Sequence, residues 1–467
     1  MSKIPRSLST AALLALLLVS SGCIQNKQCT SAADCFVGEF CQAGVCLERE
    51  DSEDPDADAP DADASDTDTL DAENPDANTP DADDPDSGLP DVDDPDADAP
   101  DADAPDTDDP DGGDEELIYE GSLILENAAD VEAARPYTEI TGGLTFQVNT
   151  DNVTSIELPA LREVRGTVMI NSLSTTESIS LPSLTTIGQG FMGSGNAALR
   201  SINLPVLETI GGAMTISNTE ASSLYFPELR QVGGSVFFSN NTTITSVSMP
   251  LLESVVGDLS LLNLSSLLEL SLGSLRTVGG TLMFGGLQVD RIVLGRLEQI
   301  GQSLSLYSNE RLEILSMPRL QEQGALGDSG SNLTFSVSTT PLLDTLEIDA
   351  LQQVHGLINI TGITAALVVE SDALQAVGHN LALSGNPGMI AVDLPALASV
   401  GNNLSIGVND ALVSVSLPSL QDVAANVSIG ANPLLSICQV LEIQEQLEDQ
   451  GWEGEFASGG NLADSCS

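Results

Sequence analysis

Residues 204–218 read LPVLETIGGAMTISN, and residues 226–240 read FPELRQVGGSVFFSN. This pattern recurs along the chain, and each copy can be aligned on an anchor, the first residue of its Leu-Pro-x-Leu step. The twelve anchors are Leu158, Leu181, Leu204, Phe226, Met249, Leu272, Leu294, Met317, Ile348, Ser371, Leu394 and Leu417. Successive anchors lie 22 or 23 residues apart, except across an insertion around residues 321–332, where the interval is 31.

Apolar residues within each repeat fall at positions −2, 0, +3, +6, +10 and +12 from the anchor. The repeat of Phe226 shows them as Leu224, Phe226, Leu229, Val232, Val236 and Phe238. Two pairs are spaced by two residues, which is strand alternation, and a Gly-marked turn separates them. No stretch within a repeat has the 3.6-residue period of a helix. The pattern predicts an all-β fold, a right-handed parallel β-solenoid over residues 117–467.

Stacking is the only way in which such repeats can bury their apolar rows, because one turn is too small to cover its own. Twelve turns at about 4.8 Å spacing predict a rod about 55–60 Å long. An Asn recurs 13–15 positions after the anchor, and we interpret this row as structural, with side chains that satisfy backbone groups at a tight corner. Its members are Asn171, Asn196, Asn218, Asn240, Asn263, Asn309, Asn386, Asn409 and Asn432.

The repeated LPxLxxIGGxLxIxxN pattern resembles the receptor L domain, a relative of the leucine-rich repeat found in insulin-type and epidermal-growth-factor-type receptors and in fungal cell-wall proteins. The resemblance covers residues 117–467. It implies the solenoid fold and an extracellular binding or structural role. It supplies no ligand residues, because this array is longer and more regular than the receptor domains.

Both ends of the solenoid are expected to be capped, since an open end would expose the core. Residues 127–135 can form a short helix over the first turn. Residues 438–450, CQVLEIQEQLEDQ, have the helical period that the repeats lack. A disulfide between Cys438 and Cys466 would tie this second helix to the tail.

The first 22 residues have the pattern of a signal peptide. Lys3 and Arg6 precede a short apolar run at residues 11–19, which is too short to span a bilayer. The following Ser20-Ser21-Gly22-Cys23 resembles the lipobox of bacterial lipoproteins, with Ser20 where the family prefers Leu. The resemblance implies lipidation of Cys23, and Ile24 in place of Asp resembles outer-membrane sorting. The alternative is an ordinary cleaved signal with an incidental Cys.

Seven cysteines leave six once Cys23 is set aside, and an oxidising compartment favours disulfides for these six. Cys29, Cys35, Cys41 and Cys46 lie in residues 23–50, at a spacing too loose for a zinc site. We interpret this segment as a small disulfide-rich module, and three pairings are open. A spacer is the expected role, and a ligand of its own is the alternative.

Residues 51–116 repeat Asp-Pro-Asp-Ala-Asp-Ala-Pro and contain 30 acidic residues with no Lys or Arg. With almost nothing apolar to bury, this segment is predicted to be a disordered acidic stalk, which could reach about 200 Å when extended. Specific calcium binding at residues 106–112 is the alternative, although calcium loops need a turn Gly and a closing bidentate acid. The formal net charge of the whole chain is −56, which argues against nucleic acid and anionic lipid headgroups as partners.

The repeats contain no Gly-x-Ser-x-Gly elbow and no phosphate-binding loop, and we predict no catalytic site, metal or cofactor. His355 and His379 are expected at solvent-facing corners one repeat apart. A polysaccharide-active enzyme is disfavoured because the outward positions are mostly Ser, Thr, Asn and Gly, with few aromatic residues for sugar stacking.

One outward column, at position +11, is the candidate binding face. It contains Met169, Met192, Phe237 and Met283, with Tyr307 nearby at +13. Exposed apolar side chains in a row can mark a contact site, and isolated apolar residues on a sheet are the alternative. We therefore predict a lipid-anchored protein of the cell envelope, exposed at the outer-membrane surface, that binds an unknown extracellular protein or glycan. The alternative is a passive structural component of the envelope.

Overall fold

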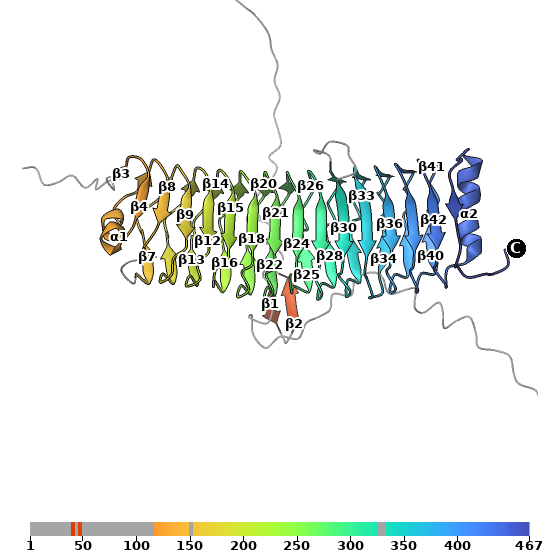
Figure 1. The fold of residues 1–467 in the computed structure, drawn as a ribbon, viewed down its shortest axis with the longest axis horizontal. Helices are drawn as coiled ribbons and strands as arrows, with labels where there is room; N and C mark the ends of the chain where they lie inside the picture. The colour runs from red at the N-terminus through yellow and green to blue at the C-terminus, as the bar shows by residue number, and fades with distance from the viewer. Residues whose placement is uncertain (1–38, 43–44, 49–115, 149–152, 325–332, 467) are drawn as a thin grey trace, which may run out of the picture. The chain divides into compact units, whose positions relative to one another are not determined.

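The computed structural model describes residues 39–42, 45–48, 116–148, 153–324 and 333–466. They belong to two compact units, Met1–Asp103 and Ala104–Ser467. In the first unit, β1 (Glu39–Gln42) and β2 (Val45–Glu48) form an antiparallel hairpin. The second unit is a parallel β-solenoid of about 13 turns with repeats of about 23 residues (Figure 1). The predicted stalk lies outside the described residues, apart from Glu116.

Most turns of the solenoid contribute three strands, and equivalent strands of successive turns pair in parallel to give three faces. Face A consists of four three-stranded sheets, whose strands are β7 (Ser155–Glu157), β10 (Ser178–Ser180), β13 (Ser201–Asn203), β16 (Ser223–Tyr225), β19 (Ser246–Ser248), β22 (Glu269–Ser271), β25 (Arg291–Val293), β28 (Ile314–Ser316), β31 (Thr345–Glu347), β34 (Val368–Glu370), β37 (Ala391–Asp393) and β40 (Ser414–Ser416).

Face B is a 14-stranded sheet of two-residue strands. They are β3 (Ile118–Tyr119), β5 (Glu139–Ile140), β8 (Glu163–Val164), β11 (Thr186–Ile187), β14 (Thr209–Ile210), β17 (Gln231–Val232), β20 (Ser254–Val255), β23 (Thr277–Val278), β26 (Gln299–Ile300), β29 (Glu322–Gln323), β32 (Gln353–Val354), β35 (Ala376–Val377), β38 (Ser399–Val400) and β41 (Asp422–Val423).

Face C is a 15-stranded sheet. Its strands are β4 (Leu123–Leu125), β6 (Leu144–Phe146), β9 (Val168–Asn171), β12 (Phe191–Ser194), β15 (Met214–Ser217), β18 (Val236–Ser239), β21 (Leu259–Leu262), β24 (Leu282–Gly285), β27 (Leu304–Tyr307), β30 (Thr334–Ser338), β33 (Leu357–Thr361), β36 (Leu381–Ser384), β39 (Leu404–Gly407), β42 (Val427–Gly430) and β43 (Phe456–Ala457).

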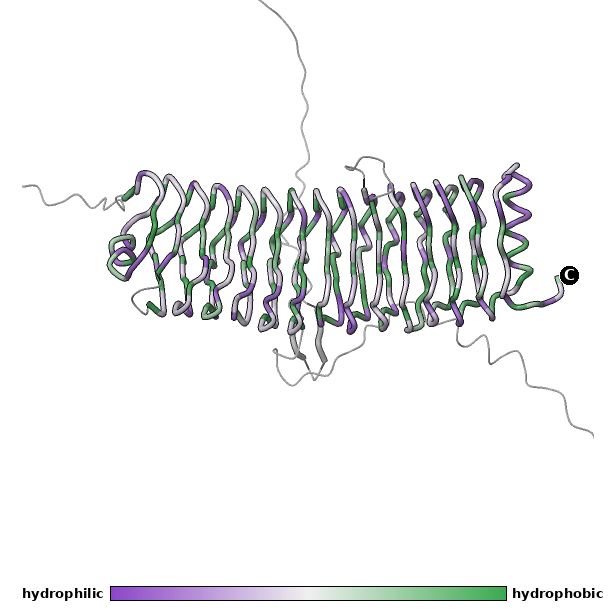
Figure 2. The backbone as a smooth tube through the Cα atoms, in the orientation of Figure 1, coloured by the Kyte–Doolittle hydropathy of each residue, from purple (hydrophilic) through white to green (hydrophobic). Residues whose placement is uncertain are grey.

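The six apolar positions predicted from the repeat point into the core. In the repeat of Phe226 all six side chains have no exposed surface. Figure 2 shows hydrophobic and hydrophilic residues alternating along the coils. The structure adds two inward positions that the sequence analysis missed, at about +15 and +18, which hold residues such as Leu264 and Leu267. Each turn therefore buries about eight side chains rather than six.

The predicted Asn row is structural, but it merges two columns of the solenoid. Asn196, Asn309, Asn386, Asn409 and Asn432 are fully buried at position +15. Each bonds the backbone of the preceding turn; the Asn409 side chain, for example, donates to the Leu383 carbonyl at 2.9 Å and accepts from the Asn386 amide at 3.0 Å. Asn241, which the prediction omitted, belongs to the same column.

The second column, at position +14, is the corner itself. Asn218, Asn240 and Asn263 have φ values of 53–55° there, in the left-handed region that Asn tolerates better than most residues. Asn171 belongs to neither column, because it is the last residue of β9, directly before the corner residue Ser172. The sequence offset of 13–15 residues groups together columns that lie only one residue apart. The hydrogen bonds of the Asn side chains distinguish these columns.

The insertion interrupts a turn without shifting the stack. Its residues 325–332 lie outside the described part of the chain, and the strands on either side keep their partners. Leu304 of β27 pairs with Phe335 of β30, which is 31 residues away. Beside the insertion, Gln323 occupies an inward position that is apolar in most repeats, and its Nε2 donates to the Gln302 carbonyl.

Helices lie at both ends of the solenoid, as predicted (Figure 1). Helix α1 (Ala128–Ala134) is capped by the Asn127 side chain, which accepts from two backbone amides, and it buries Val131 and Ala134. Helix α2 (Ile437–Asp449) is capped by Ser436 and buries Val440, Ile443 and Leu447. Among the described residues, no helix has the length and apolarity needed to cross a membrane.

Candidate binding face

Four of the five predicted binding residues lie in one column of face C. Strand pairing places Met169 beside Met192, then Thr215, Phe237, Ser260 and Met283. Each residue is the direct neighbour of the next across adjacent strands, at a spacing of about 4.8 Å. The four apolar residues of the prediction therefore belong to one continuous row, in which Thr215 and Ser260 are the polar members.

Exposure differs along this row. Met192 and Phe237 are 43% and 37% exposed, whereas Met169 and Met283 are half-buried. Ser260 is only 8% exposed although it points outward. Its neighbours in the column are the larger Phe237 and Met283, and its strand stands between theirs. A charge placed at Ser260 would therefore be only partly hydrated.

The row extends further toward the N-terminus than the sequence analysis found. Ile124 of β4 pairs with Thr145, which pairs with Met169, and Ile124 is 48% exposed. It escaped notice because the chain before Leu158 has no Leu-Pro step on which to align it. We call the eight residues from Ile124 to Met283 in this column the apolar row.

Tyr307 lies in a different column of the same face. Its register partner is Gly285, one strand away in β24, and a side chain at Gly285 would collide with the Tyr307 ring. The ring therefore lies across the space that the missing side chain leaves. Tyr307 is 37% exposed and stands two residues along the strand from Ser305, the next member of the column after Met283.

Charged residues are distributed unevenly among the three faces. The strands of face A contain six, namely Glu157, Glu269, Arg291, Glu347, Glu370 and Asp393, and those of face B contain four, namely Glu139, Glu163, Glu322 and Asp422. The 15 strands of face C contain none. Beside these strands, Asp258 directly precedes β21, and its carboxylate accepts from the Thr281 amide at 2.7 Å.

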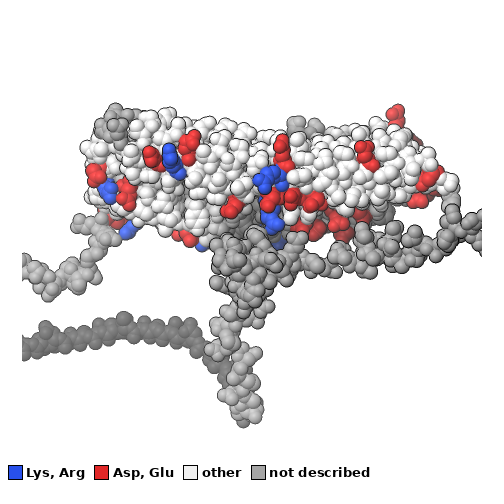
Figure 3. All heavy atoms as spheres, turned by 90° about the horizontal axis from the view of Figure 1, so that it is seen from below, with Lys and Arg blue, Asp and Glu red and all other residues white. Residues whose placement is uncertain are grey.

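Basic residues are also uneven along the rod. Arg319 is the last basic residue in the sequence, and 17 acidic residues follow it. Figure 3 shows this on one side of the molecule, where Arg side chains occur toward the N-terminal end and the middle of the rod, and acidic side chains also occur beyond them. Ion pairs join neighbouring turns in the basic half, as between Arg276 and Glu298 at 3.0 Å.

No family model, curated protein or solved structure significantly matches the chain. Its description therefore rests on the fold, a parallel β-solenoid of about 13 turns.

Other polar sites are small and open. A groove on face B is lined by Thr277, Glu298, Gln299, Gln321 and Glu322, and Glu298 in it is paired with Arg276. His355 and His379 occupy corners of consecutive turns and are half-buried rather than fully solvent-facing. Among the described residues, no group of three or more His, Cys, Asp or Glu side chains is placed to hold a metal ion.

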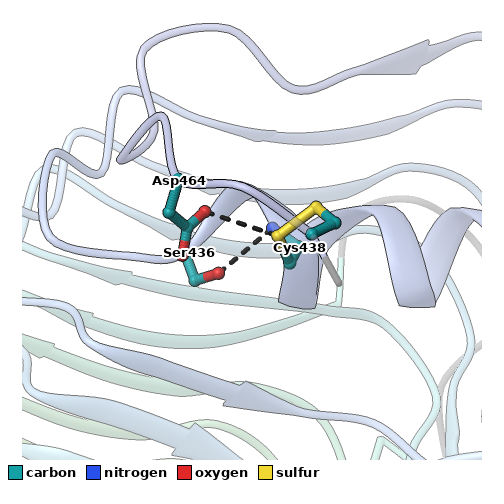
Figure 4. Close-up of a disulfide and its surroundings, with 4 residues drawn as sticks. Ser436, Cys438 and Asp464 are labelled. Carbon is teal, nitrogen blue, oxygen red and sulfur yellow. Dashed lines mark hydrogen bonds between the residues drawn. A yellow bond between two sulfur atoms is a disulfide. The ribbon is translucent and has the colours of Figure 1, made fainter.

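The C-terminal disulfide has the predicted partners. Cys438, in the first turn of α2, is bonded to Cys466 near the end of the chain (Figure 4). Its backbone amide donates to Ser436 at 3.1 Å, and its sulfur lies 3.5 Å from a carboxylate oxygen of Asp464. In the hairpin of the first unit, Cys41 and Cys46 are direct register partners. Cys23, Cys29 and Cys35 lie outside the described residues.

Proposed function

We propose that this protein is a lipid-anchored binding protein of the bacterial cell surface, which presents its solenoid to an extracellular protein or glycan. The apolar row carries the proposal. Solvent-facing methionines are adaptable contact residues, and a clustered apolar strip is a better candidate interface than scattered residues would be. Three of the seven methionines of the solenoid point outward, and all three belong to this row.

The anchor and the stalk belong to the same proposal. The lipobox-like Ser20 to Cys23 sequence supports acylation at Cys23, and the 66 acidic-repeat residues 51–116 would hold the solenoid away from the membrane. Replacing Cys23 by Ser should abolish fatty-acid labelling and release the protein from the membrane fraction. Unchanged labelling would refute the anchor and leave the binding proposal to stand alone.

The resemblance to the receptor L domain also supports an extracellular recognition role. The repeat pattern is the shared feature, and recognition by a long solenoid face suits a molecule whose described grooves are small and open. Because residues 117–467 contain 36 acidic residues and ten Arg, a net charge of −26, we expect a neutral or basic partner. Binding to a basic partner should weaken as salt is added.

The test is a binding screen with the solenoid fragment, which has its own capped core, against extracellular proteins and glycans. Replacing Met169, Met192, Phe237 and Met283 by Ser should leave the circular dichroism melt close to that of the parent and abolish binding to any partner found. The matched control replaces four exposed apolar residues elsewhere, Tyr225, Leu268, Val293 and Leu342, by Ser.

The control variant should bind like the parent protein. If instead the row variant binds normally, the site lies on another face. If the parent fragment binds no extracellular protein or glycan at all, a passive structural role in the envelope becomes the better description.

A further inference from the structure

Face C is unusual for a surface open to water. Its strands present 29 outward positions without a charged residue, on a solenoid unit whose residues 117–467 contain 46 charged residues. Soluble proteins normally intersperse charges over their exposed surfaces, because uncharged faces associate. Ten charged residues in the strands of the other two faces show that this fold accommodates them readily. The repeat architecture therefore does not account for their absence from face C.

The face is also closely packed before any partner arrives. Ser217, Ser239 and Ser260 point outward, and yet they are only 6–8% exposed. The Ser217 hydroxyl donates to Ser194 one turn away at 3.0 Å. A surface whose side chains are already held loses little conformational entropy when it is covered.

We infer that face C is a self-association surface, on which the apolar row of one molecule packs against the apolar row of a second copy. The charge distribution decides which face two copies would use. Two molecules that each carry a net charge of −26 over residues 117–467 repel each other, and face C is the one face whose strands bring no charge to the contact. In a face-to-face pair the charged faces A and B point away from the partner.

The dimensions of the face suit a dimer. Thirteen strands, from β6 to β42, at about 4.8 Å spacing, and four residues at about 3.3 Å each, give an area of about 58 by 13 Å, which two rods that run parallel cover in full while their apolar rows face each other. This is about 750 Å² per molecule, close to the roughly 800 Å² that each partner contributes to a stable interface of standard size. Two such sheets would pack about 10 Å apart. This spacing exceeds the Debye length of about 8 Å at physiological ionic strength, so salt largely screens the repulsion between the charges of the two molecules.

This inference uses the same face as the proposed function but a different partner, so the two can fail separately. A monomeric protein that binds an extracellular partner would overturn self-association alone. A dimer that binds nothing else would overturn the proposed function alone. If both occur, they should compete, since the dimer covers the apolar row.

The first test is sedimentation equilibrium of the Ala104–Ser467 unit. We expect a monomer–dimer equilibrium that shifts toward the dimer as NaCl rises from about 0.02 to about 0.5 M, because salt screens the repulsion and leaves apolar contacts intact. A unit that stays monomeric at about 100 μM in high salt would overturn the inference. So would an association that weakens with salt, because that would require contacts between opposite charges.

The second test locates the contact. The double variant Met192→Asp and Phe237→Asp places two charges on the row, two turns apart, and should weaken dimerisation at least tenfold. The control is Ser155→Asp with Ser201→Asp, which adds the same charge at the same spacing on exposed positions of face A. It should change the dimerisation constant less than twofold. Equal effects from both variants would mean that net charge, and not face C, governs the association.

A crosslinking test does not depend on those variants folding. Thr215 lies near the middle of the apolar row, so it meets its own copy to within about one turn whether the two rods run parallel or antiparallel. Thr215→Cys should form a crosslinked dimer with a short bismaleimide, whereas Ser201→Cys, on face A, should not. A crosslink at position 201 but not at 215 would place the interface on face A and overturn the inference.

Discussion

A side chain's surroundings in this protein depend on the column that it occupies. Ile300 lies at the inward +6 position of its repeat and has no exposed surface, with Val278 and Gln323 as its register partners in the neighbouring turns. Ser201, by contrast, is exposed on face A, and the side chain beside it in the chain, Ile202, points inward. One residue of displacement along a strand therefore changes a side chain from core to surface.

At this scale we predict that Ile300→Asp or Leu259→Asp lowers the free energy of unfolding by roughly 3–5 kcal/mol, because the carboxylate is buried without a partner. Ser201→Asp is the control and should change it by less than about 0.5 kcal/mol. Thermal and urea unfolding followed by circular dichroism measure both. Ser260→Asp should fall between them, since that side chain is outward but covered. The reverse ranking would show that the register is wrong.

The helix at the C-terminal end acts as a substitute for a further turn. Two glutamines of α2, two helical turns apart, form hydrogen bonds with the edge of face A. Gln439 accepts from the Val415 amide at 3.4 Å and donates to the Val413 carbonyl at 3.3 Å, and Gln446 donates to the Leu417 carbonyl at 3.0 Å. These side chains occupy hydrogen-bonding positions that a next strand would otherwise fill.

The other two faces are closed at this end by different groups. The Trp452 indole donates to the carbonyl of Val423, the last residue of face B, at 2.7 Å. On face C, β43 adds a final strand, and Asn461 continues the buried Asn column by accepting from the Asn432 amide at 3.2 Å. Closing the edges in this way prevents the last turn from pairing with another chain.

We predict that Gln446→Ala loosens this end of the rod, because it leaves the carbonyls of Leu417 and Leu420 without their side-chain donor. The loss should be about 1–3 kcal/mol and local. Amide hydrogen exchange should accelerate over residues 413–423 and remain unchanged in the first turns. Gln444→Ala is the matched control, since the Gln444 side chain donates to Glu448 on the same helix, at 2.7 Å. Equal exchange in the two variants would contradict this account of the cap.

The solenoid is a one-dimensional stack, in which each turn contacts its two neighbours. Its stability should therefore be approximately a sum of turns and interfaces between turns. The insertion around residues 321–332 shows how much sequence can enter between two strands while the register of the stack persists. Whole turns should accordingly be removable, but fractions of a turn should not.

Deleting residues 205–226 removes one repeat and joins Leu204 to Pro227, which restores the Leu-Pro step. The protein should stay folded, melt cooperatively within a few degrees of the parent, and shorten by about 4.8 Å in small-angle scattering. Deleting residues 205–215 removes half a repeat and should abolish the cooperative melt, because the inward columns no longer align. If both deletions fold equally well, the columns do not determine the stack.

The sequence alone determined the repeat, its six main inward positions, the two capping helices and the C-terminal disulfide. All of these are local or periodic: the spacing of apolar residues, the Gly turns and the 3.6-residue period of residues 438–450 can be read along the chain. The outward column of Met169, Met192, Phe237 and Met283 followed from the same alignment, and the strand pairing confirms that these residues share it.

Only the tertiary structure decided what happens between turns. The structure shows that the buried Asn409 column is distinct from the left-handed corner at Asn240. It also shows that Ser260 is almost fully buried and that the apolar row extends to Ile124. It also gathered the uncharged strands, dispersed over more than 300 residues, onto one continuous face. These features depend on contacts between residues about 23 positions apart, and their geometry exists only once the turns have stacked.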